Sequence, residues 1–380
     1  MAPTLTGHAN ESGVESDDTS QESQSSSSSP ASIKDGYKPE QSETGMDFSF
    51  GDHINMCDYA VGFTTTAKRH DPPEPFNAEN ATKKPCRSAK TTTLLQEIST
   101  SDPPLPGYSA SDQTITLVVT STIRTGARSG PQLVIFNNSM VAKIYDPLCY
   151  NPTDDSDVVG RATEAYSCEA AAYRHLQQHP EISDIVPTFY GTWSFDLSVC
   201  ISHNGLITLQ SRQVHFILIE YIQGPSMDKI NPHEISEHAR LVILKQCIDA
   251  EIRILHTGLE HRDYVPRNII LLGSDYETPR VQVKVIDFNF CELLVHPGYP
   301  DQRFAQKTIS SFNRWAPKLV NPVMRYFGNL DDFADLGWCS EDRYTTKKWM
   351  WKTFGNDCRY RSVRWDPDKP RSLPRYVDKD

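Results

Sequence analysis

The sequence predicts an α+β domain preceded by a long tail without regular structure. Runs of β-branched and aromatic residues, separated by turn residues, dominate positions 114–222. Apolar residues recur with a period of 3.6 in one segment inside this region and in another after it, which indicates two helices. Positions 1–108 show neither pattern.

The tail at 1–108 is rich in Ser, Thr and Pro and carries most of the negative charge. Positions 1–110 contain 16 acidic and eight basic residues, so −8 of the chain's net charge of −11 lies there. Such a segment cannot bury enough apolar area to offset the entropy of ordering, and we expect it to be disordered. The aromatic stretch at 46–63 is interpreted as either an unstructured patch or a docking segment.

Charge and cysteine usage exclude several classes of partner. The rest of the chain is nearly neutral and shows no basic face, so we expect no nucleic-acid partner. Nine cysteines without a CxxC pair indicate free thiols in a reducing compartment. The N-terminus lacks a signal-peptide pattern, and no apolar run approaches the roughly 18 residues of a membrane span. We expect an intracellular monomer, cytoplasmic or nuclear, with no membrane partner.

Two strands with a glycine-bearing turn between them open the domain. Thr114–Ile123 and Gln132–Phe136 have strand composition, and Gly126 and Gly130 lie between them. Glycine lets a turn fold its backbone N–H groups over phosphates. Taken alone, these residues favour an ordinary hairpin turn over a phosphate loop.

A lysine in the next strand has a possible partner on the following helix. Met140–Tyr145 is a mostly apolar run that contains Lys143, and Val158–Gln178 is periodic with Glu169 at the border of its apolar face. A lysine in mid-strand usually faces solvent. Here the ammonium can pair with the carboxylate of the helix.

Two further strands and a long helix follow. Pro187–Ser194 is aromatic, Val214–Ile222 is apolar, and 195–213 between them is expected to be a loop or a hairpin. The 3.6 period then returns and continues to Gly258, a residue that suits a helix C-terminus.

The stretch Leu259–Phe290 holds three polar side chains at the ends of short apolar strands. Asp263 and Asn268 precede the first strand, and Asp287 follows the second. Two carboxylates and a carboxamide are the groups that hold Mg²⁺ on a nucleotide and orient a hydroxyl toward it.

In their order and spacing these pieces resemble the protein-kinase-like superfamily, and the match runs from about Thr114 to Phe290. The sequence contains HRDxxPRN, Asp-Phe-Asn in place of Asp-Phe-Gly, and a hinge after Ile219. It is most similar to divergent protein kinase domain-containing proteins with the HRDxxPRN loop. The resemblance implies a two-lobed fold, with a sheet-containing N-lobe at 109–223, a mainly helical C-lobe at 224–366 and a tail at 367–380.

The resemblance also implies ATP and Mg²⁺ as cofactors and a division of roles. Asp263 would accept or orient the proton of the acceptor hydroxyl. Asn268 and Asp287 would hold Mg²⁺. Lys143 would position the α- and β-phosphates, and Glu169 would hold Lys143.

The remaining implied contacts lie in the glycine loop and the hinge. Gly126 and Gly130 would line the phosphates, and the backbone of Glu220 and Ile222 would meet the adenine. A lysine usual two residues after Asp263 is replaced by valine, so Arg267 is the residue that could supply the missing charge.

Two departures concern the loop and the length of the C-lobe. The loop does not read G-x-G-x-x-G, and only 90 residues follow Phe290, fewer than a usual kinase C-lobe requires. A shortened C-lobe weakens the prediction of a peptide-docking platform.

Three functional hypotheses therefore stay open. The first is a phosphotransferase acting on a protein Ser, Thr or Tyr hydroxyl. The second is a small-molecule kinase of the aminoglycoside or choline type, and the third is a pseudokinase that binds without turnover. The five matched polar residues speak against the third, because a decayed enzyme has no chemical reason to keep them all: Lys143, Glu169, Asp263, Asn268 and Asp287.

Overall fold

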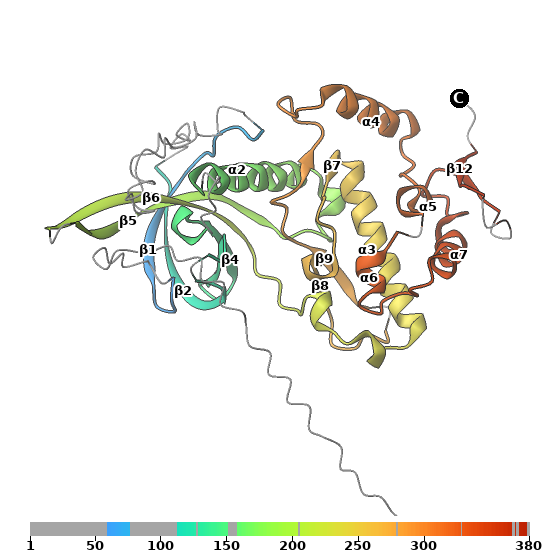
Figure 1. The fold of residues 1–380 in the computed structure, drawn as a ribbon, viewed down its shortest axis with the longest axis horizontal. Coiled ribbons are helices and arrows are strands. Elements are labelled where there is room, and N and C mark those ends of the chain that lie inside the picture. The colour runs from blue at the N-terminus through green and yellow to red at the C-terminus, as the bar shows by residue number, and fades with distance from the viewer. Residues whose placement is uncertain are drawn as a thin grey trace, which may run out of the picture. The chain divides into compact units, whose positions relative to one another are not determined.

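A computed structural model describes most of the chain after residue 58 and shows a mixed α and β structure (Figure 1). The described residues are 59–76, 112–126, 128–150, 158–203, 206–278, 280–327, 329–366, 369 and 372–377. Most of the predicted disordered tail, including 46–58, lies outside these residues, as do most positions of the C-terminal tail.

Six antiparallel strands close into a barrel in the order β1-β2-β3-β4-β6-β5. Their bounds are Thr64–Arg69 for β1, Thr114–Arg124 for β2, Gln132–Phe136 for β3, Met140–Tyr145 for β4, Phe189–His203 for β5 and Leu206–Glu220 for β6. The predicted strands of 114–145 are confirmed. The stretch 195–213 was expected to be a loop or a hairpin. It forms the outer part of the β5–β6 hairpin, which continues beyond the other strands in Figure 1.

Alternate residues of β3 and β4 belong to two different hydrophobic clusters. Val134 of β3 and Ala142 of β4 belong to a cluster inside the barrel. Ile135 and Val141 of the same strands belong to the larger cluster that continues into the helical part of the chain. Successive residues of a strand point to opposite faces, so one face of β3 and β4 fills the barrel and the other faces the rest of the domain.

Strand β1 shows that the prediction of a structureless segment up to residue 108 is wrong for 59–76. Thr64–Arg69 pairs with β2 and with β5 and so closes the sheet into a barrel. Tyr59 is buried, and its hydroxyl donates to Asp146 Oδ2 at 2.6 Å. The sequence gives little warning, because Ala67 is the only fully buried residue of β1 and both partner strands are distant in the chain.

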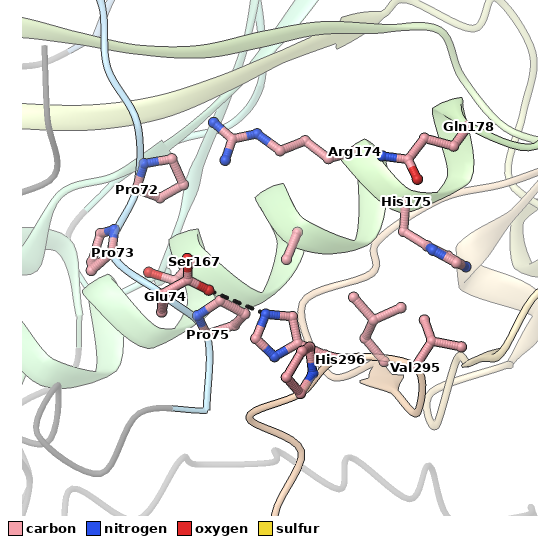
Figure 2. Close-up of a pocket in the computed structure, with 13 residues that line it drawn as sticks. Pro72, Pro73, Glu74, Pro75, Ser167, Arg174, His175, Gln178, Val295 and His296 are labelled. Carbon is pink, nitrogen blue, oxygen red and sulfur yellow. Dashed lines mark hydrogen bonds and ion pairs between the residues drawn. The ribbon is translucent and has the colours of Figure 1, made fainter. Parts of the chain in front are cut away.

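After β1 the chain forms a strap, Asp71–Phe76, that runs along helix α2, Val158–Gln177 (Figure 2). Arg174 of α2 pairs with Asp71 at 2.6 Å. Farther along, Glu74 accepts from His296 Nε2 at 3.2 Å. A cavity of about 280 Å³ lies between the strap, α2 and the segment around His296. The strap therefore links the barrel to the helical part of the chain.

The helical part begins with α3, Glu237–His256, which Ser236 caps by accepting from the Ala239 amide at 3.3 Å. Gly258 follows at φ +95°, so the predicted end of this helix is confirmed within two residues. The further helices are α4 Gln302–Trp315, α5 Pro322–Tyr326, α6 Asp331–Ala334 and α7 Arg343–Phe354. No described helix has the combination of length and apolar character that crossing a membrane requires.

Short strand pairs and 3₁₀ helices complete the described part. The strands are β7 Leu259–Glu260 with β10 Glu292–Leu293, β8 Ile269–Leu272 with β9 Gln282–Val285, and β11 Val363–Arg364 with β12 Arg375–Tyr376. The 3₁₀ helices are Pro147–Cys149, Pro180–Ile182, Met227–Lys229, Pro232–Glu234 and Pro266–Asn268.

Candidate functional site

The β8–β9 hairpin brings two of the predicted site residues to the same end. Asn268 immediately precedes β8, and Asp287 lies two residues after β9. The Ile286 amide donates to the Asn268 carbonyl at 2.9 Å, which fixes the two segments together. Asp287 adopts φ +68°, a left-handed conformation that turns the chain sharply at this point.

Lys143 joins three distant segments. Its Nζ lies 2.5 Å from Glu169 Oε2 and also pairs with Asp287 Oδ1. The side chains of Lys143 and Glu169 are 4% and 1% exposed, whereas that of Asp287 is 28% exposed. The lysine and helix carboxylate that the sequence suggested as partners are thus in contact. The carboxylate of Asp287 completes the group on its open side.

Sequence reasoning missed a residue that positions Glu169. The hydroxyl of Tyr145 donates to Glu169 Oε2 at 2.6 Å, and the amide of Phe288 donates to Oε1 at 3.2 Å. Tyr145 follows Lys143 by two positions on β4, so both side chains point to the same face. This spacing places Tyr145 on the face of Lys143 but does not by itself reveal the hydrogen bond to Glu169.

The charges of this group depend on one another. Burial disfavours the ammonium of Lys143, but the carboxylates of Asp287 and Glu169 outweigh it and raise its pKa. Burial also disfavours the carboxylate of Asp287, but the charge and hydrogen bond of Lys143 lower its pKa. Burial raises the pKa of Glu169 against the opposing effect of Lys143. A cation is therefore needed to keep this pair of carboxylates in the protein interior.

Asp263 is held by two neighbours on its own loop. Arg267 Nη2 donates to its two carboxylate oxygens at 2.7 and 2.9 Å. Asn268 Nδ2 donates to Asp263 Oδ2 and to the Asp263 carbonyl, each at 2.9 Å. Arg267, the predicted source of the missing charge, lies directly beside the carboxylate. These contacts fix the direction in which Asp263 can accept a proton.

The neighbours of Asp263 anchor the loop. His261 is buried, and its Nε2 lies 3.0 Å from the Ile286 carbonyl, which suits a structural role and not that of a base. Arg262, at φ +61°, lies 3.3 Å from Glu292 and 3.6 Å from Glu260.

The oxygen atoms available at this site fit Mg²⁺. Asn268 uses its Nδ2 as a donor twice, so its Oδ1 is left as an acceptor, and Asp287 has Oδ2 beside the oxygen that pairs with Lys143. Mg²⁺ prefers oxygen ligands and takes few from the protein, with water and phosphate supplying the rest. Among the residues the structure describes, no group of three or more His, Cys, Asp or Glu side chains forms a separate metal site.

The glycine loop differs from the expectation that its glycine amides face phosphates. The Gly126 amide donates to Gln132 Oε1 at 2.6 Å, and the Gly130 amide donates to the Cys149 carbonyl at 2.9 Å. The buried carboxamide of Gln132 also donates to the Gly130 carbonyl at 2.7 Å and to Ser129 Oγ at 2.8 Å. The loop is therefore closed on Gln132, a residue that sequence reasoning missed.

The backbone amides of the two hinge residues, Glu220 and Ile222, differ in their hydrogen bonds. The amide of Glu220 donates to the Thr188 carbonyl at 2.8 Å. The amide of Ile222, a buried residue, donates to no described residue.

Protein kinase domains are among the solved structures to which this chain is similar. The crystal structure of the BubR1 kinase domain is 14% identical, covers 49% of this chain and 50% of that chain, and gives a TM-score of 0.31. The Rio2 kinase–ADP/Mg²⁺–phosphoaspartate complex from Chaetomium thermophilum is 17% identical, covers 64% of each chain and gives a TM-score of 0.32. The match thus spans half of one of these chains and less than two thirds of the other. No protein-family model and no curated protein matches this chain.

Proposed function

We propose that this chain is an ATP- and Mg²⁺-dependent phosphotransferase with a two-lobed, protein-kinase-like fold. The γ-phosphate of ATP would pass to a protein Ser, Thr or Tyr hydroxyl. The observation that carries the proposal is the buried contact of Lys143 with both Glu169 and Asp287.

A purely structural ion pair does not require this arrangement. One carboxylate is enough to neutralise Lys143, and a second negative charge beside a buried pair adds a desolvation penalty. Asp287 is the most exposed of the three, and Lys143 pairs with only one of its two carboxylate oxygens. The excess of negative charge at an open edge is what a nucleotide-bound cation would neutralise.

The residues divide the work of the reaction between them. Mg²⁺-ATP, when bound, supplies the transferable phosphoryl group. Lys143 holds the phosphates, and Glu169 fixes its ammonium in place. Asp263 orients the acceptor hydroxyl and takes its proton on a carboxylate oxygen. Arg267 places positive charge next to that carboxylate. Such a reaction depends on positioned charge more than on covalent chemistry.

The structure also supports one alternative, a module that binds nucleotide with little turnover. Both glycine amides of the loop already have protein acceptors. Val265 stands where the resemblance expects a lysine. The acceptor could also be a metabolite instead of a protein. The experiment below distinguishes these two kinds of acceptor.

The test is transfer of label from [γ-³²P]ATP in a cell extract supplemented with the purified protein. Wild type should label the macromolecular fraction, and Asp263→Asn should lower the label by at least about 100-fold because the proton acceptor is lost. Asp275→Asn, in the β8–β9 connection, is the matched control and should behave as wild type. Label confined to small molecules would identify a small-molecule kinase. Label that does not depend on Asp263 would contradict the proposal.

A further inference from the structure

Arg124, the last residue of β2, is in register with Lys143. Arg124 lies opposite Leu133 of β3, and Leu133 lies opposite Lys143 of β4. Residues directly opposite each other in antiparallel strands point to the same face. Leu133 packs against the cluster outside the barrel, so this is the face that looks toward Glu169 and Asp287. Neighbouring strands are about 4.8 Å apart, so the Cα atoms of Arg124 and Lys143, on either side of β3, lie about 10 Å apart.

A β-bulge sets this direction. The register of β2 and β3 shifts between Thr122 and Arg124, so Ile123 is an extra residue. Thr122 lies opposite Val134, whose side chain is inside the barrel. Regular alternation would turn Arg124 to the same side as Thr122. The extra residue turns it to the opposite face, as bulges beside active sites commonly do.

The guanidinium of Arg124 has no acidic partner among the described residues. Its hydrogen bond is to the neutral carbonyl of Pro131, at 3.4 Å, and the side chain is exposed. Arg124 is therefore an unneutralised cation that faces the acidic site.

The closed glycine loop leaves a role for this cation. The amides of Gly126 and Gly130 are engaged, so they do not offer the N–H groups that usually cradle phosphates. A guanidinium presents several N–H donors in a fixed plane and binds phosphate oxygens in pairs.

We propose that Arg124 binds the phosphates of the nucleotide from the sheet side and takes over the role of the glycine amides. The inference rests on the proposed function, since it requires Mg²⁺-ATP in the site of Lys143 and Asp287. Arg124 lies in a strand and belongs to none of the kinase-like motifs, so the sequence alone did not suggest this role.

The test is equilibrium binding of Mg²⁺-ATP and of adenosine by calorimetry. Arg124→Gln should weaken ATP binding by about tenfold or more, because a charged hydrogen bond to phosphate is lost. Adenosine binding should change by less than about twofold, which also shows that the variant is folded. Arg124→Lys should recover part of the ATP affinity. Arg128→Gln, which removes an exposed cation from the turn after β2, should bind ATP as wild type does.

The experiment distinguishes failure of the proposed function from failure of the role proposed for Arg124. If wild type binds no ATP, the proposed function is overturned and this inference with it. If wild type binds Mg²⁺-ATP and Arg124→Gln binds it within about twofold of wild type, only the role of Arg124 is overturned. An equal loss of ATP affinity in Arg128→Gln would also overturn it, because net charge and not position would then explain the effect.

Discussion

Lys143 is the residue at which the barrel, helix α2 and the segment after β9 meet. It is buried and faces two carboxylates, so each of the three groups depends on the charges of the others. Coulombic attraction between buried charges is strong, but it offsets the cost of desolvation only while every partner is present. The site is therefore sensitive to loss of the lysine in stability as well as in ligand binding.

Replacement of the lysine gives the residue-scale prediction. Lys143→Met should lower the free energy of unfolding by about 3–5 kcal/mol, because it leaves Glu169 as an uncompensated buried carboxylate. Adding Glu169→Gln should restore at least about half of the loss, since glutamine removes the charge and keeps an acceptor for the Phe288 amide. Urea denaturation at pH 7 measures both changes.

The matched control is Lys68→Met, which removes an exposed lysine from β1. It should change the free energy of unfolding by less than about 0.5 kcal/mol. A similar small loss for Lys143→Met would show that its contacts with Glu169 and Asp287 do not hold the interior together.

At this scale the sequence identified residues by type and spacing but not by their hydrogen bonds. Lys143 and Glu169 could be suggested as partners because each stands out from an apolar background. Tyr145 and Gln132 could not, because their roles depend on which atoms meet after folding. Nothing in the local sequence distinguishes a tyrosine that holds a carboxylate from one that fills the core.

At the scale of elements, segment 59–76 is the part that local patterns did not reveal. Strands β2 to β4 and helices α2 and α3 were predictable because each carries a repeating apolar pattern. Strand β1 is short and polar, and it is held by pairing with strands about 50 and 125 positions later in the chain. Such non-local pairing leaves no periodic signal in the sequence.

A ring stack ties this segment to the barrel and to α2. The ring of His70 stacks on His215 of β6 with 4.2 Å between centroids, and His215 stacks on Tyr166 of α2 at 5.3 Å. The Nδ1 atom of His70 is also 2.9 Å from the hydroxyl of Tyr166. Burial lowers the pKa of His70 to about 4; the charge of Asp71 opposes this shift and that of Arg174 adds to it. Burial and the charge of His70 lower the pKa of His215 to about 3.

These pKa values predict a loss of stability on mild acidification. Between pH 6.5 and 4 the unfolded chain protonates both histidines and the folded chain does not, so the unfolded state binds more protons. The free energy of unfolding should therefore fall from pH 7 to pH 5, by roughly 1–2 kcal/mol for each histidine. The double variant His70→Phe, His215→Phe should lose this part of the pH dependence in urea denaturation.

The control for the stack is His238→Phe, which replaces an exposed histidine of α3. Its stability should follow the pH in parallel with wild type. If the double variant also runs parallel with wild type, the two histidines are not held neutral, and segment 59–76 does not pack against the barrel as described.

At the scale of the whole molecule, the site is a product of how the elements are placed. β4, α2, the Asp263 loop and the β8–β9 hairpin each contribute polar groups, and no single element contains the site. The order of motifs predicted this convergence. It did not predict the closed barrel, which needs β1, or the closure of the glycine loop on Gln132.

The most direct measurement is calorimetric titration of the protein with ATP in the presence and absence of Mg²⁺. Wild type should bind ATP at least about tenfold more tightly with Mg²⁺, and the matched control Asp275→Asn should do the same. Asp287→Asn should lose this dependence on Mg²⁺, because an open carboxylate oxygen of the site is replaced by a neutral amide. Absence of ATP binding by wild type, or an unchanged Mg²⁺ dependence in Asp287→Asn, would contradict the assignment of this site.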